Sequence, residues 1–336
     1  MSKRFMIRAG LLIIFFVFCF TTIVSGKTIK LTYSNFFPPT HIQSILAQKW
    51  CNEVEKRTNG KVKVEYYPGQ TLTKADQAYD GVVEGLSDIA LSCLAYSRGR
   101  FPVLGAVDLP MGYTSGVSAT KVANRVLNNF NPKEFNDTKI MYLHAHGPGL
   151  VHTKNKPVEK IEDIKGLKLR SHGTSAKIVK TLGGTPVGLP MPETYQSIQK
   201  GIVDGSVYPF ESNKGWKLGE VTDYATAAFS CAYTTTFFVA MNKDKWNLLS
   251  KNIQEIIENI NKEWQLKHGQ AWDDSDFIGI KFFLNQGNKI IGLNKKESLK
   301  WEKAVQPIIN DYIAILNKKK LNGKKIINFI KNEVKK

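Results

Sequence analysis

Residues Ile164–Glu220, IKGLKLRSHGTSAKIVKTLGGTPVGLPMPETYQSIQKGIVDGSVYPFESNKGWKLGE, contain three short strand patterns, each followed by a helical pattern. We expect strands at Gly166–Arg170, Thr185–Leu189 and Ser206–Phe210. Short strands that alternate with helices are typical of a parallel sheet, and ligands of such sheets lie beyond the carboxyl ends of the strands. Arg170 and the segment Tyr208–Glu211 fall at those ends, so the sequence predicts a binding site there.

The N-terminal third of the chain repeats this alternation. Alternating apolar residues predict three strands, and helical patterns begin after the first two of them; the expected elements are strands Lys27–Tyr33, Lys61–Tyr67 and Ile89–Leu94, with helices starting at Ile42 and Thr73. This β-α-β-α-β order indicates a first α/β domain. The loop after its first strand holds Phe36, Phe37, Thr40 and His41, which either pack in the turn or line a cleft and offer donors to an anion.

The first 26 residues have the composition of a secretory signal peptide. Lys3, Arg4 and Arg8 precede an apolar run from Leu11 to Phe20, and small residues surround Ser25. The apolar run is short for a membrane span, although an uncleaved N-terminal anchor is the alternative. We therefore expect an exported, periplasmic protein whose signal peptide is cleaved near residue 26.

Net charge restricts the partners only weakly. The formal charge falls from +18 to +15 without the signal peptide, and much of the excess lies in a lysine-rich C-terminal tail. Such a charge is compatible with nucleic acid or a membrane surface, but a solvated lysine-rich face is the simpler interpretation. We expect no nucleic-acid partner, and we expect that a basic exterior helps to collect anionic solutes.

Cysteines and histidines give no metal or redox motif. Cys51, Cys93 and Cys231 form no C-x-x-C pair, their odd number leaves at least one thiol free, and whether the other two pair stays open. His144 and His146 share one face of a strand, with His152 nearby, but no acid or cysteine joins them at ligand spacing. We predict no metal site and no cofactor.

No catalytic motif is present in the sequence. It lacks G-x-S-x-G, a P-loop, H-E-x-x-H and the dinucleotide glycine fingerprint, so we expect a protein that is not an enzyme. A periplasmic metal-dependent hydrolase is the rival interpretation and needs the histidines to converge with acids. A ligand-binding protein that serves a sensor is a third.

Five segments carry a family resemblance. They are KGLKLR at 165–170, PETYQSIQKGIVDG at 192–205, TTTFFVAMNKDKW at 234–246, LTYSNFFPPTH at 31–41 and YSRGRFP at 96–102. Together they resemble the solute-binding proteins of TRAP transporters (the DctP family), the soluble partners of tripartite ATP-independent uptake systems for organic acids. The segments cover most of the mature chain in the order expected for that family.

The resemblance implies a two-lobed α/β fold of the periplasmic-binding-protein kind, with a long helix that spans both lobes. A helical pattern that starts at Lys251 and extends past about 45 Å fits that helix. The implied division assigns residues 27–147 and about 236–275 to lobe I, and residues 148–235 and about 276–336 to lobe II. The chain is expected to cross between the lobes near His146.

The resemblance also implies the binding residues. Arg170 stands where the family's arginine clamps the substrate carboxylate, and a guanidinium matches a carboxylate through two parallel hydrogen bonds. Tyr208 departs from the family's asparagine and offers a phenolic donor, while Glu211 either accepts from the solute or caps a helix. Only one of Phe237 and Phe238 can face the cleft. The remaining expected contacts are Phe36, Phe37, Thr40, His41, Tyr96 and Met191, with Tyr33 in the aromatic lining; Arg98 and Arg100 are either anion ligands or surface charges.

The function that the resemblance implies is capture of an organic anion. The solute pairs with Arg170, the lobes close by a hinge motion, and the closed monomer docks on the TRAP permease in the membrane. The aromatic lining suits a flat or apolar carboxylate. The partners expected are therefore a small carboxylate and the integral-membrane permease subunits.

Overall fold

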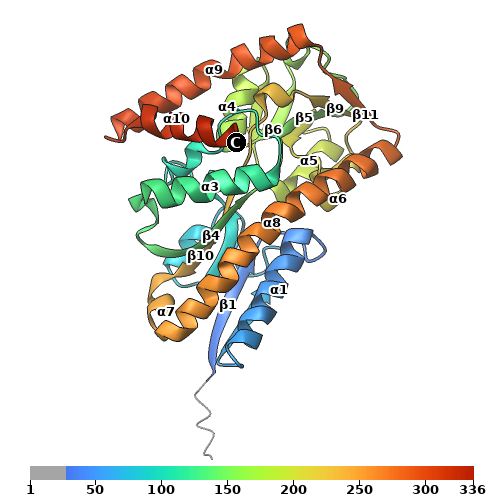
Figure 1. The fold of residues 1–336 in the computed structure, drawn as a ribbon. Helices are drawn as coiled ribbons and strands as arrows, with labels where there is room; N and C mark the ends of the chain where they lie inside the picture. Colours follow the sequence, from blue (N-terminus) through green and yellow to red (C-terminus); the bar gives the residue numbers. More distant parts are fainter. Residues whose placement is uncertain (1–27) are drawn as a thin grey trace, which may run out of the picture.

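The strands of the chain form two separate sheets, each the centre of one lobe (Figure 1). A computed structural model describes residues 28–336, so the predicted signal peptide at 1–26 lies outside the described residues. Lobe I is built on a five-stranded sheet with the order β2-β1-β3-β10-β4. Its strands are β1 (Ile29–Asn35), β2 (Val62–Tyr67), β3 (Ile89–Cys93), β4 (Thr138–Ala145) and β10 (Thr236–Asn242).

The first three strands of lobe I are parallel, as the β-α-β-α-β pattern predicts. β10, which lies in the segment 234–246 quoted for the resemblance, returns from lobe II and inserts antiparallel between β3 and β4. Helices α1 (Ile42–Arg57) and α3 (Gly116–Phe130) cover this lobe, together with the short α2 (Ala78–Val83) and α7 (Lys243–Asn247). The helix expected from Thr73 begins only at Ala78, because side chains of Ser34 and Gln70 bind the backbone N–H groups of Thr73 and Ala75.

Lobe II is built on a six-stranded sheet with the order β11-β9-β5-β8-β6-β7. Its strands are β5 (Leu150–Thr153), β6 (Lys168–Ser171), β7 (Thr185–Gly188), β8 (Gly205–Tyr208), β9 (Tyr224–Ala227) and β11 (Lys289–Gly292). The predicted parallel unit is confirmed, since β6 pairs in parallel with both β7 and β8. Its helices are α4 (Gly173–Thr181), α5 (Thr194–Gln199) and α6 (Ser212–Gly215).

Helix α8 (Lys251–Asn285) spans both lobes, as predicted. Its 35 residues extend over about 52 Å, and the Ser250 side chain caps its start by accepting from the backbone N–H of Ile253. Figure 1 shows α8 beside α1 in one lobe and reaching α6 in the other, and α8 contacts α3 and β4 as well. The helix therefore packs against elements of both lobes.

The chain crosses between the lobes after β4, before β10 and within α8. Helix α9 (Lys295–Lys318) packs against α4, but α10 (Gly323–Val334) packs against α3 of lobe I. The predicted lobe boundaries stay a prediction, and this contact favours placing α10 with lobe I. Among the described residues, no helix combines the length and apolar character needed to cross a membrane.

Candidate functional site

A cavity lies between the lobes. The loop after β1 and the end of β3 line it from lobe I, and the ends of β6 and β8 with α6 line it from lobe II. The sequence-predicted residues that the structure brings to this cavity are Phe36, Phe37, Tyr96, Arg170, Met191, Tyr208, Glu211 and Phe237. The carboxyl ends of the strands thus meet where the α/β pattern predicts a ligand site.

Arg170 is buried at the end of β6 with only 1% of its surface exposed. Its Nε donates to the carbonyl oxygen of Leu189 at 2.8 Å, and Nη2 donates to the Tyr96 hydroxyl at 3.3 Å. No carboxylate of the described residues forms an ion pair with this guanidinium. A buried charge is costly unless it is paired, and the described residues supply no acidic partner for this one.

The two histidines that line the cavity carry no charge at neutral pH. Burial lowers the pKa of His146 to about 4, and its Nδ1 donates to the Gly147 carbonyl oxygen at 2.6 Å. Burial and then the Arg170 guanidinium hold the pKa of His172 well below its ordinary value. Among the described residues, Arg170 is therefore the single permanent cation that lines the cavity.

Flat aromatic rings form much of the remaining wall. Phe36 and Phe37 stack with their ring centroids 4.2 Å apart, and Phe36 also stacks with Trp216 across the lobes at 6.1 Å. Phe237 stacks on Trp272 at 5.2 Å, whereas Phe238 lies on the opposite face of β10 against Tyr79. The structure thus brings Phe237, and not Phe238, to the cavity.

Tyr208 lines the cavity with its ring, but its hydroxyl is engaged inside lobe II. That hydroxyl donates to Asn213 Oδ1 at 3.2 Å and lies 3.1 Å from Thr222 Oγ1. The ring stacks on His152 with centroids 3.8 Å apart. This geometry does not support the hydrogen bond from Tyr208 to a solute that we expected from the sequence.

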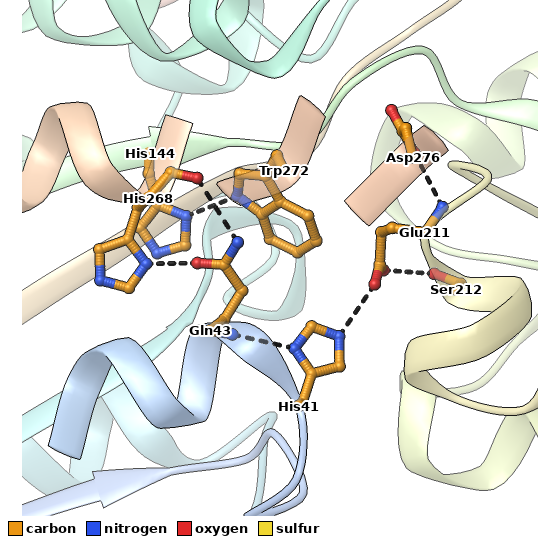
Figure 2. Close-up of polar contacts among 8 residues, drawn as sticks. All are labelled: His41, Gln43, His144, Glu211, Ser212, His268, Trp272 and Asp276. Atoms are coloured by element: carbon orange, nitrogen blue, oxygen red, sulfur yellow. Dashed lines mark hydrogen bonds and ion pairs between the residues drawn. The ribbon is translucent and has the colours of Figure 1, made fainter. Parts of the chain in front are cut away.

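Glu211 and His41 bind each other across the lobes (Figure 2). His41 Nε2 lies 3.0 Å from Glu211 Oε2, and His41 Nδ1 accepts from the backbone N–H of Gln43 at the start of α1. Ser212 Oγ donates to the other carboxylate oxygen, Oε1, at 2.6 Å. Of the two alternatives for Glu211, side-chain capping is not realised: Glu211 occupies the N-cap position of α6, but its carboxylate makes no cap hydrogen bond and contacts the opposite lobe instead.

Two other expected contacts from the loop after β1 lie outside the cavity. His41 is buried but does not line the cavity, because its ring packs behind Phe37 and Trp216. Thr40 is exposed to solvent just before α1 and also lies outside the cavity. Tyr33, expected in the aromatic lining, packs between Trp50 and Tyr66 in the core of lobe I.

Helix α8 supplies the remaining contacts in Figure 2. Trp272 Nε1 donates to His144 Nδ1 at 2.9 Å, which fixes the indole that forms part of the cavity wall. Asp276 Oδ1 accepts from the backbone N–H of Glu211 at 2.8 Å and so ties α8 to α6. The pKa of Asp276 is held well above its ordinary value by burial and by the nearby Glu211 carboxylate.

The arginines and cysteines whose roles the sequence left open do not line the cavity as charged or metal-binding groups. Arg100 pairs with Asp80 and Asp137 away from the cavity, and Arg98 is exposed and does not line it. Cys51, Cys93 and Cys231 are all buried free thiols. Within residues 28–336 no three histidine, cysteine or acidic side chains gather in an arrangement suited to a metal ion.

Several lining residues were missed by the sequence analysis; they are His172, Ser212, Trp216, Tyr233, Thr235 and Trp272. Trp216 follows the predicted Tyr208–Glu211 segment by a few residues, so its place after the third strand was a usable signal. Trp272 had no such signal, because an apolar residue at helical spacing in a long helix predicts packing rather than a cavity wall.

The family model described as bacterial extracellular solute-binding protein, family 7, matches residues 33–315 of this chain. A relative with 26% identity over 295 residues is the C4-dicarboxylate-binding periplasmic protein DctP of Rhodobacter capsulatus, with 84% of this chain and 86% of the relative covered.

Two solved structures are similar over nearly the whole fold. One is a TRAP solute-binding protein from Rhodoferax ferrireducens in complex with copurified benzoate: it is 26% identical, the match covers 91% of this chain and 98% of that chain, and the TM-score is 0.86. The other is a marine metagenome TRAP solute-binding protein specific for aromatic acid ligands, in complex with 3-hydroxybenzoate: it is 29% identical, the match covers 92% of this chain and 98% of that chain, and the TM-score is 0.86.

Proposed function

Because the chain belongs to family 7 of the bacterial extracellular solute-binding proteins, we propose that it captures an organic acid between its lobes and delivers it to a TRAP-type membrane permease. Proteins of this family bind solutes, and in the proposed role the protein does no chemistry on the acid. Export to the periplasm, after cleavage of the predicted signal peptide, places it where such a role is needed.

The observation that carries the proposal is the buried guanidinium of Arg170 without an acidic partner. A carboxylate that enters the cavity accepts two parallel hydrogen bonds from the guanidinium and neutralises its charge. A neutral analogue of the same shape leaves the charge unpaired, so binding selects for anions. Met191 and Tyr96 position the arginine, since the Tyr96 hydroxyl contacts both Arg170 Nη2 and the backbone N–H of Met191.

The aromatic walls favour an acid with a flat apolar body. Phe36, Trp216 and Phe237 line the same cavity as Arg170, and stacking against such rings rewards an aromatic ligand. Two similar solved structures hold benzoate and 3-hydroxybenzoate, which supports an aromatic carboxylate here as well. Tyr208 contributes its ring face to the same wall.

Delivery follows from the two-lobed construction. The cavity walls come from both lobes, so a bound acid stabilises the closed arrangement in which His41 meets Glu211. The closed monomer then presents a surface made from both lobes, which the permease distinguishes from the open form. Release of the acid requires the lobes to separate.

Thermal unfolding in the presence of benzoate, 3-hydroxybenzoate and the neutral benzamide tests this function. An acid at about a thousand times its dissociation constant stabilises the folded state by about 4 kcal/mol, which raises the melting temperature by several degrees. We expect shifts with the acids and none with benzamide. Arg170→Ala removes the cation and should abolish the shifts.

Arg98→Ala is the matched control, because Arg98 is an exposed arginine outside the cavity. This variant should keep the acid-induced shift of the parent protein. If Arg170→Ala still responds to the acids while Arg98→Ala does not, the anion binds elsewhere and the assignment of Arg170 fails.

A further inference from the structure

The described residues that line the cavity carry one charged group of each sign, and the two groups are not paired with each other. Arg170 is the single permanent cation among the described lining residues, and Glu211 is the single acidic one. The two side chains form no ion pair with each other. One carboxylate of a ligand therefore has a partner in the cavity, and a second carboxylate has none.

The Glu211 carboxylate stands beside the cavity without a lysine or arginine partner among the described residues. Its oxygens contact only the Ser212 hydroxyl and the His41 imidazole. Only 3% of its surface is exposed, so water does not screen it. An added negative charge in the cavity meets this carboxylate in a poorly hydrated, aromatic environment.

We propose that Glu211 restricts the site to monocarboxylates by repelling a second negative charge on the ligand. This inference rests on the proposed function, which supplies the first carboxylate for Arg170. The names of the relatives leave the ligand's charge open, because a C4-dicarboxylate-binding protein and proteins that hold aromatic acids are all similar to this chain.

The physical reason is that a dicarboxylate must leave one charge desolvated. The walls beyond Arg170 consist largely of Phe36, Phe237 and Trp272 rings, and these cannot pair with an anion. Glu211 adds like-charge repulsion at the same place, and such repulsion typically costs several kcal/mol. Glu211 thus discriminates between ligands without contacting the carboxylate that Arg170 holds.

Calorimetric titration with pairs of ligands of equal shape tests the inference. Each dicarboxylate is paired with its own monoamide: isophthalate with 3-carbamoylbenzoate, terephthalate with 4-carbamoylbenzoate, and succinate with succinamate. In the pair whose monoamide binds most tightly, we expect the monoamide to bind roughly a hundredfold or more tightly than the dicarboxylate. Equal affinities within that pair would overturn the proposal.

The variants Glu211→Gln and His41→Gln distinguish the effect of the Glu211 charge from the effect of the contact between the lobes. Both variants alter the contact between the lobes, but only Glu211→Gln removes the carboxylate. We expect the monoamide-to-dicarboxylate affinity ratio to fall about tenfold or more in Glu211→Gln. In His41→Gln, both affinities should change together, so the ratio should stay at the parent value. Melting curves of both variants establish that they are folded.

The outcomes distinguish this inference from the proposed function. A large ratio in the parent protein that is unchanged in Glu211→Gln would overturn the role of Glu211, while the carboxylate site would stand. Failure of benzoate and of every monoamide to bind would contradict the proposed function and remove the basis of this inference as well.

Discussion

At the scale of single residues, His152 is a buried group whose protonation the fold opposes. Its ring stacks on Tyr208, its Nδ1 donates to the Leu150 carbonyl oxygen at 3.3 Å, and its Nε2 is buried without a partner. Burial lowers the pKa of His152 from 6.5 to about 3. The stability that this residue contributes is therefore complete above pH 6.5 and is lost as the pH falls toward 3.

His152→Phe should make the protein less sensitive to acid. Below pH 6.5 the unfolded parent chain binds a proton at His152 and the folded chain does not, which costs about 1.4 kcal/mol of stability per pH unit. Phenylalanine keeps the stacked ring and has no proton to bind. The free energy of unfolding, measured with urea between pH 7.5 and pH 4, should thus rise in the variant relative to the parent as the pH falls. Parallel pH profiles for the two proteins would contradict this account.

The sequence predicted the position of a residue within its own strand better than contacts between residues of distant segments. Arg170 was placed correctly because its position at a strand end follows from the strand pattern itself. The contact between His41 and Glu211 joins residues 170 positions apart, and nothing local in either segment indicates it. Trp272 reaches the cavity only because α8 crosses the interface between the lobes.

At the scale of elements, the start of α1 and the short helix α6 are closely packed through His41 and Glu211. A Cβ atom at Gly215, the last residue of α6, would lie 2.6 Å from Glu211 Oε2 and 2.8 Å from His41 Nε2. The absence of a side chain at this position is what lets the two elements approach. Because the contact joins side chains of the two lobes, a separation of the lobes breaks it.

Gly215→Ala should weaken ligand binding and leave the unliganded protein stable. The added methyl group obstructs the closed form by about 1–3 kcal/mol, which corresponds to roughly ten- to hundredfold weaker binding of benzoate. Gly292→Ala is the control, because a Cβ at Gly292 in lobe II would meet nothing within 4 Å. Calorimetric affinities and melting temperatures check both variants. A Gly215→Ala protein that binds like the control would mean that this contact does not limit closure.

The elements with a clear helical or alternating sequence pattern were predicted. Three strands that depend on pairing with other strands were not. Helix α8 and the parallel strands β6 to β8 carry clear helical or alternating patterns. Strands β5, β9 and β11 were missed, although their four residues each make them no shorter than β6, β7 and β8. They become strands through pairing with one another and with β8, a non-local effect that a short sequence pattern does not contain.

At the scale of the whole molecule, we expect the excess positive charge to raise the rate at which an anion associates with the protein. The formal charge of +18 falls to +15 without the predicted signal peptide, and little of it lies in the cavity, where Arg170 is the single permanent cation among the described lining residues. Charges spread over a surface attract a small anion over distances up to the Debye length, about 30 Å at 10 mM salt and about 8 Å at 150 mM salt. In the proposed function, steering and binding are therefore carried by different residues.

Raising the salt concentration from about 10 mM to 150 mM should slow the association of benzoate several-fold and leave its dissociation rate nearly unchanged. Dissociation depends on the buried contacts of Arg170 and the aromatic walls, which salt screens little because water is excluded from them. Trp216 and Trp272 line the cavity, so intrinsic tryptophan fluorescence in a stopped-flow instrument can report both rates. An association rate independent of salt would show that the basic exterior does not attract the acid. A dissociation rate that rises steeply with salt would place the bound carboxylate at the surface, and would thereby contradict its capture by the buried arginine.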